Sequence, residues 1–388
     1  MNDYYDIIIV GAGPAGSMAA QYAAREGASV ALFERDRRVG SPVRCAEGVS
    51  HKSLETLVEI KSSWIAQEIT GAVFHSPHGK TVKINTDQIG YVLHREIFDH
   101  DLAQMAVAQG AHLYTRANVT GLIKENGKIK GITLDHRGET FDIKCKIIIA
   151  ADGVESRVGR WAGIKTRTAM KDIETCAQIT ASPIDVAPTD IHFYFSRDLA
   201  PGGYIWIFPK GNRVANVGLG ISGEYTEKSP MEYLDQFLTK FPNVSALTTT
   251  IGSVPCSLPL EKVVADGFMI VGDAAHHANP MTGGGIINGM IGGKIAGEIA
   301  GKSIKENDRS ERRLSEYSKT FNKIEGNKLK KFYRIKKVIY KFSDQELNQI
   351  ADRVLEMPPE KQTLINIFRI ALVKKPTLVL DVIKLFTT

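Results

Sequence analysis

The opening residues limit the fold of this chain more than any other feature. Residues 6–10 are mostly β-branched and predict a buried strand. Gly11, Gly13 and Gly16 follow in the G-x-G-x-x-G spacing, and the small residues over 17–26 predict a helix. In such a unit the first glycine permits a tight turn, the second lets the backbone approach a pyrophosphate, and the third lets helix and strand pack closely. The phosphates are expected at the helix N-terminus, where free N–H groups and the helix dipole favour negative charge.

An acidic residue follows the glycines at the distance that this kind of unit requires. Gly27 ends the predicted helix, residues 28–33 predict a second strand, and Glu34 comes directly after it. A carboxylate at this point can accept hydrogen bonds from ribose hydroxyls. Three glycines alone are weak evidence, but here strand, helix, second strand and terminal acid stand in the expected order. We therefore predict that the N-terminal unit binds a dinucleotide.

Composition restricts the class of protein and its surroundings. The 388 residues are 43% hydrophobic and 24% charged, which is typical of a soluble globular protein of one to three domains. No apolar stretch approaches about 18 residues, and no basic region with a cleavage site precedes the first strand, so neither a membrane span nor a signal peptide is expected. Cys45, Cys145, Cys176 and Cys256 are too far apart for C-x-x-C spacing. We expect a reducing cytoplasm and no metal site.

Two later segments repeat the pattern of a buried strand that ends at an acidic residue. Residues 147–151 lead into Asp152, and residues 267–271 lead into Gly272 and Asp273. In an open parallel sheet such residues meet at the carboxyl edge, where ligands bind. The sequence therefore places both segments beside the N-terminal unit.

A glycine-rich loop over 280–285 then enters a helix that is predicted over 286–300. This arrangement gives a second helix N-terminus that is suited to an anion. His276 and His277 precede the loop, and we interpret them as packing or solvent-facing residues in preference to acid–base groups.

An irregular loop over 37–48 follows the first unit, and its basic residues suit a phosphate neighbour. Cys45 in this loop is either a redox catalyst or a small buried residue whose backbone lines the cofactor, and both interpretations stay open. Farther along, residues 65–93 predict short strands with a turn at 76–79, and residues 95–109 predict a helix.

The middle of the chain changes to an alternating pattern. Residues 191–221 contain three strands that predict an antiparallel sheet with one covered face. By the period of two, Tyr204, Trp206 and Phe208 share one face of that sheet. They either belong to the core or line an apolar substrate cavity.

From residue 305 the chain is charged and helical. Residues 328–341 carry seven basic side chains that alternate with apolar ones. This helix either docks on the body of the protein or contacts an anionic membrane surface. The last 25 residues predict two short helices separated by Pro376, and neither is long enough to span a bilayer.

Three signals therefore stand in one order: the glycines with Glu34, then Asp152-Gly153, then Gly272-Asp273. This order resembles the flavoprotein class typified by p-hydroxybenzoate hydroxylase, in which a substrate-binding sheet interrupts one FAD domain. Four segments narrow the resemblance to the geranylgeranyl reductases, and within them to the archaeal digeranylgeranylglycerophospholipid reductases: residues 41–48, 150–156, 203–210 and 272–275. The resemblance covers residues 4–340.

The resemblance implies an α/β fold with a Rossmann-like FAD-binding domain, an antiparallel-sheet substrate domain that interrupts it, and a C-terminal helical region. We expect the FAD-binding domain to comprise residues 1–60, 94–172 and 256–304. The substrate domain would comprise 61–93 and 173–255, and the helical region 305–388.

FAD is the implied cofactor. The residues expected to contact it, several through backbone atoms, are Gly11, Gly13, Ala15, Gly16, Glu34, Arg44, Cys45, Ala46, Gly48, Arg95, Val119, Asp152, Gly272, Asp273, Gly285 and Ile286. Tyr204, Trp206 and Phe208 would line the substrate cavity, and Cys45 is the catalytic candidate. Members of the family often carry glycine where this chain has Ala46, so a positive φ at that position would strain the loop mildly.

The implied activity is the FAD-dependent saturation of isoprenoid double bonds in archaeal-type membrane ether lipid precursors. The electron donor is not identified by the sequence and would be NAD(P)H, a deazaflavin or ferredoxin. The proton donor is equally open between Cys45, His276 and water. The alternatives are a flavin monooxygenase of the same fold and a non-catalytic lipid-binding flavoprotein.

The partners expected are the isoprenoid lipid and no nucleic acid, because the basic run is local. Lys330, Lys331, Lys336 and Lys337 are the residues through which the basic helix would contact an anionic lipid surface. The expected location is the cytoplasm, with peripheral contact at the inner face of the cell membrane as the further hypothesis.

Overall fold

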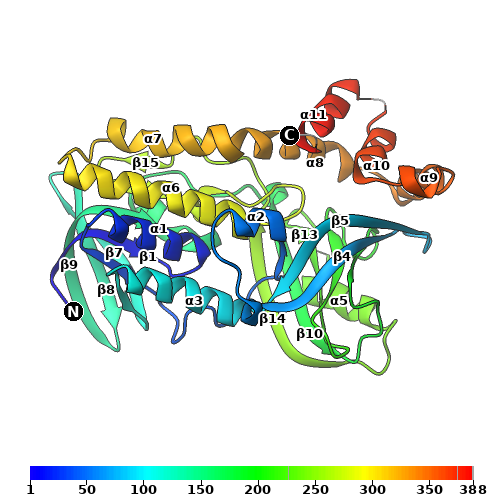
Figure 1. Ribbon diagram of the computed structural model, residues 1–388, viewed down its shortest axis with the longest axis horizontal. Helices are drawn as coiled ribbons and strands as arrows, with labels where there is room; N and C mark the ends of the chain where they lie inside the picture. The colour runs from blue at the N-terminus through cyan, green and yellow to red at the C-terminus, as the bar shows by residue number, and fades with distance from the viewer. Residues whose placement is uncertain (226, 374, 387–388) are drawn as a thin grey trace.

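The computed structural model describes residues 1–225, 227–373 and 375–386, and it places two eight-stranded sheets side by side along the long axis of the molecule (Figure 1). The first sheet has the order β15-β16-β9-β1-β2-β6, with the β7–β8 hairpin joined to β9. Its strands are β1 (Tyr4–Val10), β2 (Val30–Phe33), β6 (His112–Tyr114), β7 (Ala117–Glu125), β8 (Lys128–His136), β9 (Glu139–Ala150), β15 (Val264–Ala265) and β16 (Phe268–Ile270). The predicted α/β arrangement is confirmed.

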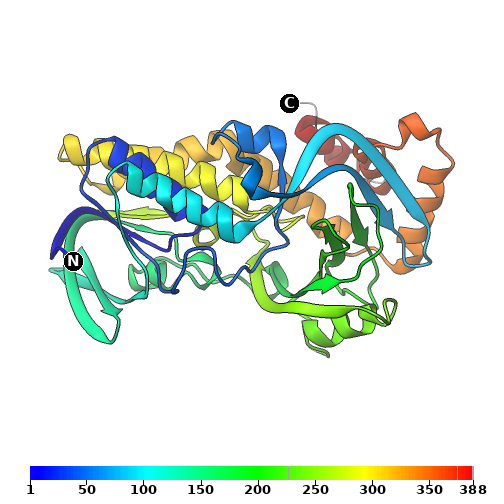
Figure 2. The same ribbon diagram turned by 60° about the horizontal axis from the view of Figure 1, so that its bottom comes forward.

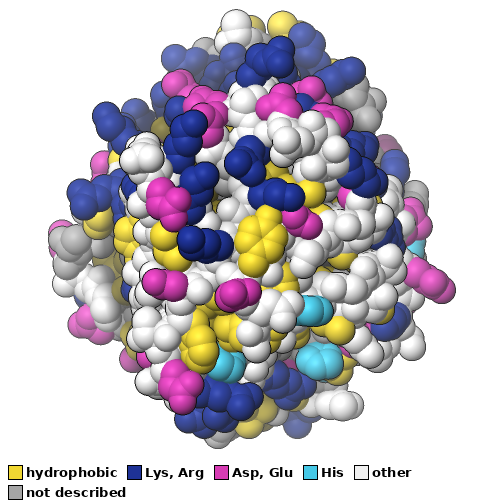
Figure 3. Space-filling model, turned by 90° about the vertical axis from the view of Figure 1, so that its left-hand side faces the viewer, with side chains coloured by type: hydrophobic (Ala, Val, Ile, Leu, Met, Phe, Trp, Pro, Cys, Tyr) yellow, Lys and Arg dark blue, Asp and Glu magenta, His cyan; other side chains and the backbone are white. Residues whose placement is uncertain are grey.

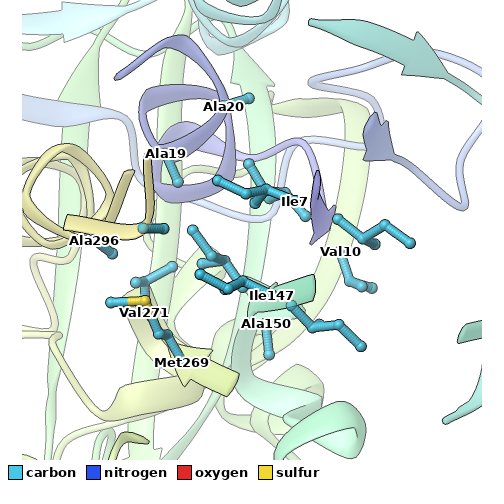
Figure 4. Packing of buried hydrophobic residues seen from close by; sticks show 14 of the residues in the cluster. Ile7, Val10, Ala19, Ala20, Ile147, Ala150, Met269, Val271 and Ala296 are labelled. Carbon is cyan, nitrogen blue, oxygen red and sulfur yellow. The ribbon is translucent and has the colours of Figure 1, made fainter. Parts of the chain in front are cut away.

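The parallel strands of the first sheet are buried on both faces, as their β-branched runs predict. Ile7 of β1 lies in register with Val30 of β2 on one side and Ile147 of β9 on the other. Figure 4 shows these isoleucine side chains packed with Ala19 and Ala296 from the covering helices. This core fixes the relative positions of the strand ends.

Strands β1, β2, β9 and β16 end level with one another. Val10 pairs with both Phe33 and Ala150, and Ile270 also pairs with Ala150. Because these strands are parallel, the segments that follow them meet at one carboxyl edge. These segments hold the glycine motif, Glu34, Asp152 and Gly272-Asp273.

Helices cover the first sheet, and Figure 1 shows α1 (Pro14–Arg25) between α3 (Arg95–Ala108) and α6 (Ile286–Lys305), with α7 (Glu311–Phe321) beyond α6. Glycines every four residues let α6 touch α1 backbone to backbone. A Cβ at Gly293 would lie 2.0 Å from the Ala15 carbonyl oxygen, and one at Gly297 would lie 2.3 Å from that of Ala19. The glycine stripe therefore sets the close distance between the two helices.

The second sheet has the order β14-β10-β13-β12-β11-β4-β5-β3. All neighbours are antiparallel except β11 and β4, which run parallel. The strands are β3 (Gly48–Ser50), β4 (Ile65–His75), β5 (Thr81–Leu93), β10 (Ile173–Ser182), β11 (Asp190–Tyr194), β12 (Tyr204–Pro209), β13 (Ala215–Ser222) and β14 (Ser245–Pro255). The long hairpin of β4 and β5 thus extends the aromatic sheet.

The prediction of short strands over residues 65–93 is wrong, because this segment forms only the two long strands β4 and β5. The predicted turn is present, and the Gly79 N–H donates to the Ser76 carbonyl oxygen at 2.9 Å. Gly71 marks a shift in register and not a reversal of the chain. A Cβ there would lie 2.1 Å from Asp190 Oδ1, so the glycine serves a close contact inside the sheet.

The two faces of the second sheet have different neighbours. Helix α5 (Pro230–Leu238) covers one face, against which Ile205 and Ile207 are fully buried. Tyr204 and Trp206 alternate with these isoleucines and lie on the opposite face. That opposite face borders the cavity described below.

The C-terminal helices lie beside the β4–β5 hairpin in both ribbon views (Figures 1 and 2). A π-helical turn (Asn322–Gly326) joins α7 to α8 (Asn327–Ile339), and α9 (Asp344–Leu355), α10 (Leu364–Ala371) and α11 (Pro376–Phe386) follow. Val82 of β5 packs against Ala351 and Val354 of α9. Within the described ranges no helix is long and apolar enough to cross a membrane.

Shorter elements are α2 (His51–Glu55), α4 (Arg157–Trp161) and 3₁₀ turns at Ser62–Trp64, Gly153–Glu155, Met170–Asp172, Gly272–Ala275 and Pro359–Lys361.

Charges of both signs are interspersed on the end of the molecule that carries the first sheet (Figure 3). Arg313 of α7 illustrates the pattern, because it contacts Glu306 and Glu316, each at 2.6 Å. Lys305 similarly pairs with Glu26 at 2.8 Å. These two basic side chains are therefore paired with acidic neighbours.

Candidate active site

A cavity of about 910 Å³ runs from the carboxyl edge of the first sheet along the uncovered face of the second. One end is lined by the glycine loop, the 44–50 loop and the start of α6. The rest is lined by β4, β11 and β12 and by side chains of α8, α9 and α10. The cavity thus joins a polar end at one sheet to a long apolar region at the other.

Two helix N-termini open into the polar end. Gly13 is the N-cap of α1 and Gly285 is the N-cap of α6, and neither helix receives a hydrogen bond from a capping side chain. The first N–H groups of both helices are therefore available to a ligand, and both dipoles favour an anion. No atom lies within 4 Å of a Cβ built at Gly13, whereas one at Gly285 would lie 2.9 Å from Asp273 Oδ1. The space beside Gly13 at the start of α1 is therefore open, whereas Gly285 at the start of α6 packs closely against the Asp273 carboxylate.

A smaller cavity of about 140 Å³ adjoins this end, and Glu34, Arg44 and Arg95 contribute to its wall. Glu34 accepts from the Ala12 and Asp36 N–H groups, each at 2.9 Å, which leaves further lone pairs on both oxygens. Arg95 is held by two 2.7 Å hydrogen bonds to Asp99, and the pKa of its guanidinium is raised, since this carboxylate outweighs the effect of burial. The small cavity is therefore a rigid, charged recess next to the glycine loop.

The 44–50 loop is organised by a residue that the sequence did not single out, Glu47. It is 3% exposed, and its carboxylate forms an ion pair with Lys210 and accepts from Asn216 Nδ2 at 2.5 Å and from the Arg95 N–H at 3.1 Å. The positive φ of the loop falls here, at 74°, and not at Ala46. The suggested strain at Ala46 is therefore wrong, and the strained residue is Glu47.

Cys45 lines the cavity beside these groups. Its Sγ accepts from the Glu47 N–H at 3.2 Å, and its carbonyl oxygen accepts from Gln178 Nε2 at 2.9 Å. Burial raises the pKa of the Cys45 thiol. The group therefore remains a thiol at neutral pH, which is unsuited to a nucleophile but compatible with proton donation.

The aromatic face of β12 forms the wall next to Cys45. Tyr204, Trp206 and Phe208 all line the cavity and also pack together. Trp206 Nε1 donates to Gln178 Oε1 at 2.9 Å, and its ring occupies the space in which a Cβ at Gly218 would stand, 2.6 Å away. Both interpretations of these aromatics therefore hold at once, because they are core residues on one side and cavity wall on the other.

Comparison with protein-family models finds two matches in this chain. The model of the geranylgeranyl reductase catalytic domain matches residues 172–254, and that of an NAD(P)-binding Rossmann-like domain matches residues 9–66. The first match covers β10–β14 of the second sheet, and the second covers the glycine motif.

Among curated proteins, the digeranylgeranylglycerophospholipid reductase of Methanocella arvoryzae is 44% identical over 99% of this chain and 100% of its own length. The chain belongs to the digeranylgeranylglycerophospholipid reductase family. A second member, reductase 1 of Methanococcoides burtonii, is 42% identical over 94% of this chain and 91% of its own.

Solved structures agree with membership of this reductase family. A geranylgeranyl bacteriochlorophyll reductase-like protein from Thermoplasma acidophilum superposes with a TM-score of 0.91 at 35% identity, covering 99% of this chain and 100% of that one. A triple mutant of a flavin-dependent brominase has a TM-score of 0.70 at 19% identity, covering 96% and 100%, and so shares the fold alone.

Most residues expected at the site of a digeranylgeranylglycerophospholipid reductase are brought together by the structure. Those that line the large cavity are Gly13, Ala15, Arg44, Cys45, Ala46, Gly48, Arg95, Tyr204, Trp206, Phe208, Gly272, Asp273, Gly285 and Ile286. Glu34 lines the smaller cavity. Gly11 and Gly16 lie behind the wall, where a Cβ at Gly16 would be 1.8 Å from the Gly11 carbonyl oxygen.

Two more of the expected cofactor residues, besides Gly11 and Gly16, line neither cavity. Val119 of β7 is 8% exposed and packs in the core of the first sheet. Asp152 Oδ2 accepts from the Val158 N–H of α4 at 2.9 Å, while its Oδ1 is buried without a partner among the described residues. Asp152 therefore caps a short helix just behind the cavity wall.

The two histidines before α6 also lie outside the cavity. His276 contacts Ser257 Oγ at 2.7 Å and Thr168 Oγ1 at 3.1 Å. His277 stacks on Phe321 with ring centroids 3.8 Å apart, and burial lowers its pKa to about 3. Both are neutral packing residues in a member of this reductase family, so His276 is excluded as the proton donor.

The C-terminal helices were predicted from the sequence, but their place in the cavity wall was not. Leu347, Ile350, Ala351 and Val354 of α9 line the cavity, and so does a second set in α10 with the same spacing. That i, i+3, i+4, i+7 spacing was the signal that could have found them. Lys336 was also misplaced: it is 4% exposed and faces inward, so it cannot contact a membrane surface.

Proposed function

We propose that this chain is an FAD-dependent reductase that saturates the isoprenoid double bonds of digeranylgeranylglycerophospholipid precursors. One observation carries the proposal: a single cavity joins two uncapped helix N-termini to a long apolar region with aromatic walls. The helix ends suit a cofactor with a pyrophosphate, and the apolar region suits an isoprenoid chain. The family to which the chain belongs supports the same reaction.

FAD fits the polar end of the cavity on the chemistry of the residues there. Gly13, Ala15 and the N-terminus of α6 would hold its pyrophosphate and ring, and Glu34 would accept from its ribose. When bound and reduced, this cofactor supplies the hydride for the alkene.

Four thiols occur in the chain, at Cys45, Cys145, Cys176 and Cys256, and all are free.

The chain itself orients the lipid and excludes water. An unpolarised double bond offers no group for a hydrogen bond, so its position depends on the shape of the apolar walls. Burial of each methylene stabilises the complex by about 0.8 kcal/mol, and a long chain therefore gains affinity from many weak contacts. Tyr204, Trp206 and Phe208 are the residues that we assign to this wall next to the cofactor.

We also propose a division of the chain into an FAD-binding domain, a substrate domain and a helical region. The FAD-binding domain would comprise residues 1–60, 94–172 and 256–304, the substrate domain 61–93 and 173–255, and the helical region 305–388. The strands of the two sheets follow this division except for β3, which lies in the first segment but pairs with β5. The β3 strand continues the 44–50 loop, so the loop is anchored in both domains.

The test is an anaerobic reoxidation experiment. The protein carrying FAD is reduced with dithionite, and an isoprenoid lipid with geranylgeranyl chains is added without oxygen. We expect the absorbance of oxidised flavin to return and the lipid to gain two hydrogens for each flavin. A flavin that stays reduced until oxygen enters would contradict the proposal and favour a monooxygenase or a non-catalytic lipid-binding flavoprotein.

The electron donor and the membrane contact are further parts of the proposal. NAD(P)H, a deazaflavin or ferredoxin would reduce the flavin. The same anaerobic absorbance measurement distinguishes these donors if each in turn replaces dithionite. The membrane contact would use Lys330 and Lys337, which are exposed on α8, together with the partly buried Lys331, after exclusion of the buried Lys336.

A further inference from the structure

The aromatic wall of the cavity contains one carboxyl group for which the proposed reaction has so far given no role. Glu174 of β10 lies on the same face as Cys176 and Gln178 by the period of two, and all three line the cavity, whereas Ala177 and Ile179 are buried on the α5 side. The residue is 6% exposed. Gly220 of the neighbouring strand pairs with Cys176 and has no side chain beside these residues; a Cβ there would lie 3.3 Å from Cys176 Sγ and 3.8 Å from the Glu174 Cβ.

The two oxygens of Glu174 have different surroundings. Oε1 accepts from Lys336 Nζ at 3.0 Å, and the same ammonium group also donates to the Cys256 carbonyl oxygen at 3.0 Å. Oε2 is buried and has no hydrogen-bond partner in the described part of the chain. Six buried side-chain atoms there lack a partner, and of these only Glu174 Oε2 belongs to a residue that lines the cavity.

The described part of the cavity wall has two other acidic residues. Glu47 is engaged, because its carboxylate has three partners. Asp273 lies at the cofactor end, where a Cβ at Gly285 would be 2.9 Å from its Oδ1, and so is placed beside FAD in the proposed reductase. A negative charge on Glu174 Oε2 would be poorly solvated, because no donor reaches it. A proton on Oε2 makes the carboxyl group neutral, so no poorly solvated negative charge remains. The hydrogen bond from Lys336 to Oε1 is kept.

We propose that the Glu174 carboxyl is the acid that protonates the alkene carbon, and this inference rests on the proposed reductase function. FAD, when bound and reduced, would supply the hydride for the new C–H bond at one alkene carbon. The π electrons form a C–H bond at the other carbon with the proton from Oε2, and the O–H pair stays on the carboxylate. The alkene is reduced by two electrons, the flavin is oxidised, and solvent returns the proton to Glu174 between turnovers.

The electrostatics agree with this role. Burial raises the pKa of Glu174 above its usual value, and the Lys336 ammonium offsets only part of that effect. An acid must be protonated to act, so kcat is expected to fall as pH rises through the pKa of Glu174. The other titratable groups that face Glu174 across the cavity wall are Asp172, Cys176, Tyr204, Cys256, Lys336 and Tyr340.

The test compares Glu174→Gln with wild type in the holoenzyme. Glutamine keeps the size and the acceptor for Lys336 but is not an acid. We expect kcat with the lipid to fall by about 10²–10⁴-fold, KM to change little, and the high-pH limb of the kcat profile to disappear. The matched control is Tyr333→Phe, which removes the 3.0 Å contact of α8 with Asp172 one turn from Lys336 and should keep wild-type kcat.

A second readout does not depend on turnover. Infrared difference spectra of wild type and Glu174→Gln at pH 7 should show a protonated carboxyl band that the variant lacks. Absence of that difference, or wild-type kcat in Glu174→Gln, would overturn the role of Glu174 while the reductase function stands. Failure of wild type itself to reduce the lipid would overturn the proposed function, and this inference with it.

Discussion

At the scale of single residues, Glu47 carries more of the site than its place in a loop suggests. It combines a left-handed backbone with a buried carboxylate whose main partner, Lys210, is 14% exposed. Replacement by Gln would leave the lysine without its counter-charge in a poorly solvated place. We expect Glu47→Gln to lower the free energy of unfolding by about 3–5 kcal/mol and to weaken FAD binding, because the cofactor loop loses its anchor.

Urea unfolding of four proteins measures this effect: wild type, Glu47→Gln, Lys210→Met and the double variant. The double variant should be more stable than the sum of the single changes predicts, since it removes both charges together. Asp185→Asn is the control, because its partner Arg213 lies in an exposed pair that contributes little. Additive effects in the four proteins would show that Glu47 and Lys210 do not stabilise each other.

The same residue shows what a sequence can and cannot reveal. Glu34 and Asp273 were predictable because each lies just beyond the end of a buried strand of recognisable pattern. Glu47 was not, because Lys210 and Asn216 lie 163 and 169 positions away along the chain. Contacts of that separation depend on how the two sheets meet, and no local pattern encodes them.

At the scale of elements, α8 is divided into two faces that its charge pattern did not distinguish. Lys336 and Tyr333 face inward, whereas Lys330 and Lys337 are exposed. Seven basic residues in one segment suggested a single basic surface, but one of them is a buried ion-pair partner. Only the exposed lysines are available to an anionic membrane.

We therefore expect Lys330→Gln and Lys337→Gln together to weaken binding to vesicles with anionic lipid. Each lysine near such a surface contributes about 1 kcal/mol, so each change should reduce affinity about fivefold at low salt. Cosedimentation with vesicles measures the change. The double variant Lys128→Gln and Lys144→Gln, in β8 and β9 at the other end of the molecule, removes the same charge and should bind as wild type does (Figure 1). An equal loss of vesicle binding in both double variants would mean that the net charge of the protein, and not α8, attracts it to the anionic lipid.

At the scale of the whole molecule, the cavity is complete only because the last quarter of the chain returns to the substrate sheet. The His78 N–H donates to Asn348 Oδ1 at 3.0 Å, and the Arg197 N–H donates to Asp344 Oδ1 at 2.8 Å. These bonds hold α9 over the tip of the β4–β5 hairpin and the end of β11. The helices of this region were predictable, but their role as a wall was not, since it requires the sheet against which they pack.

This arrangement predicts that α9 helps to set the length of chain that the cavity accepts. Ala351 is 8% exposed and lines the apolar region far from the glycine loop, so Ala351→Phe would shorten the cavity. If two methylene groups of the lipid lose their place in the cavity, binding weakens by about 1.6 kcal/mol, which is about 15-fold. We expect kcat/KM to fall by that factor or more for geranylgeranyl substrates and to stay near the wild-type value for farnesyl ones. Leu355→Phe places a phenyl ring at an exposed position of the same helix and should change neither. An equal loss for both chain lengths in Ala351→Phe would show that the ring disturbs the fold of the wall, because a shorter cavity discriminates against the longer chain alone.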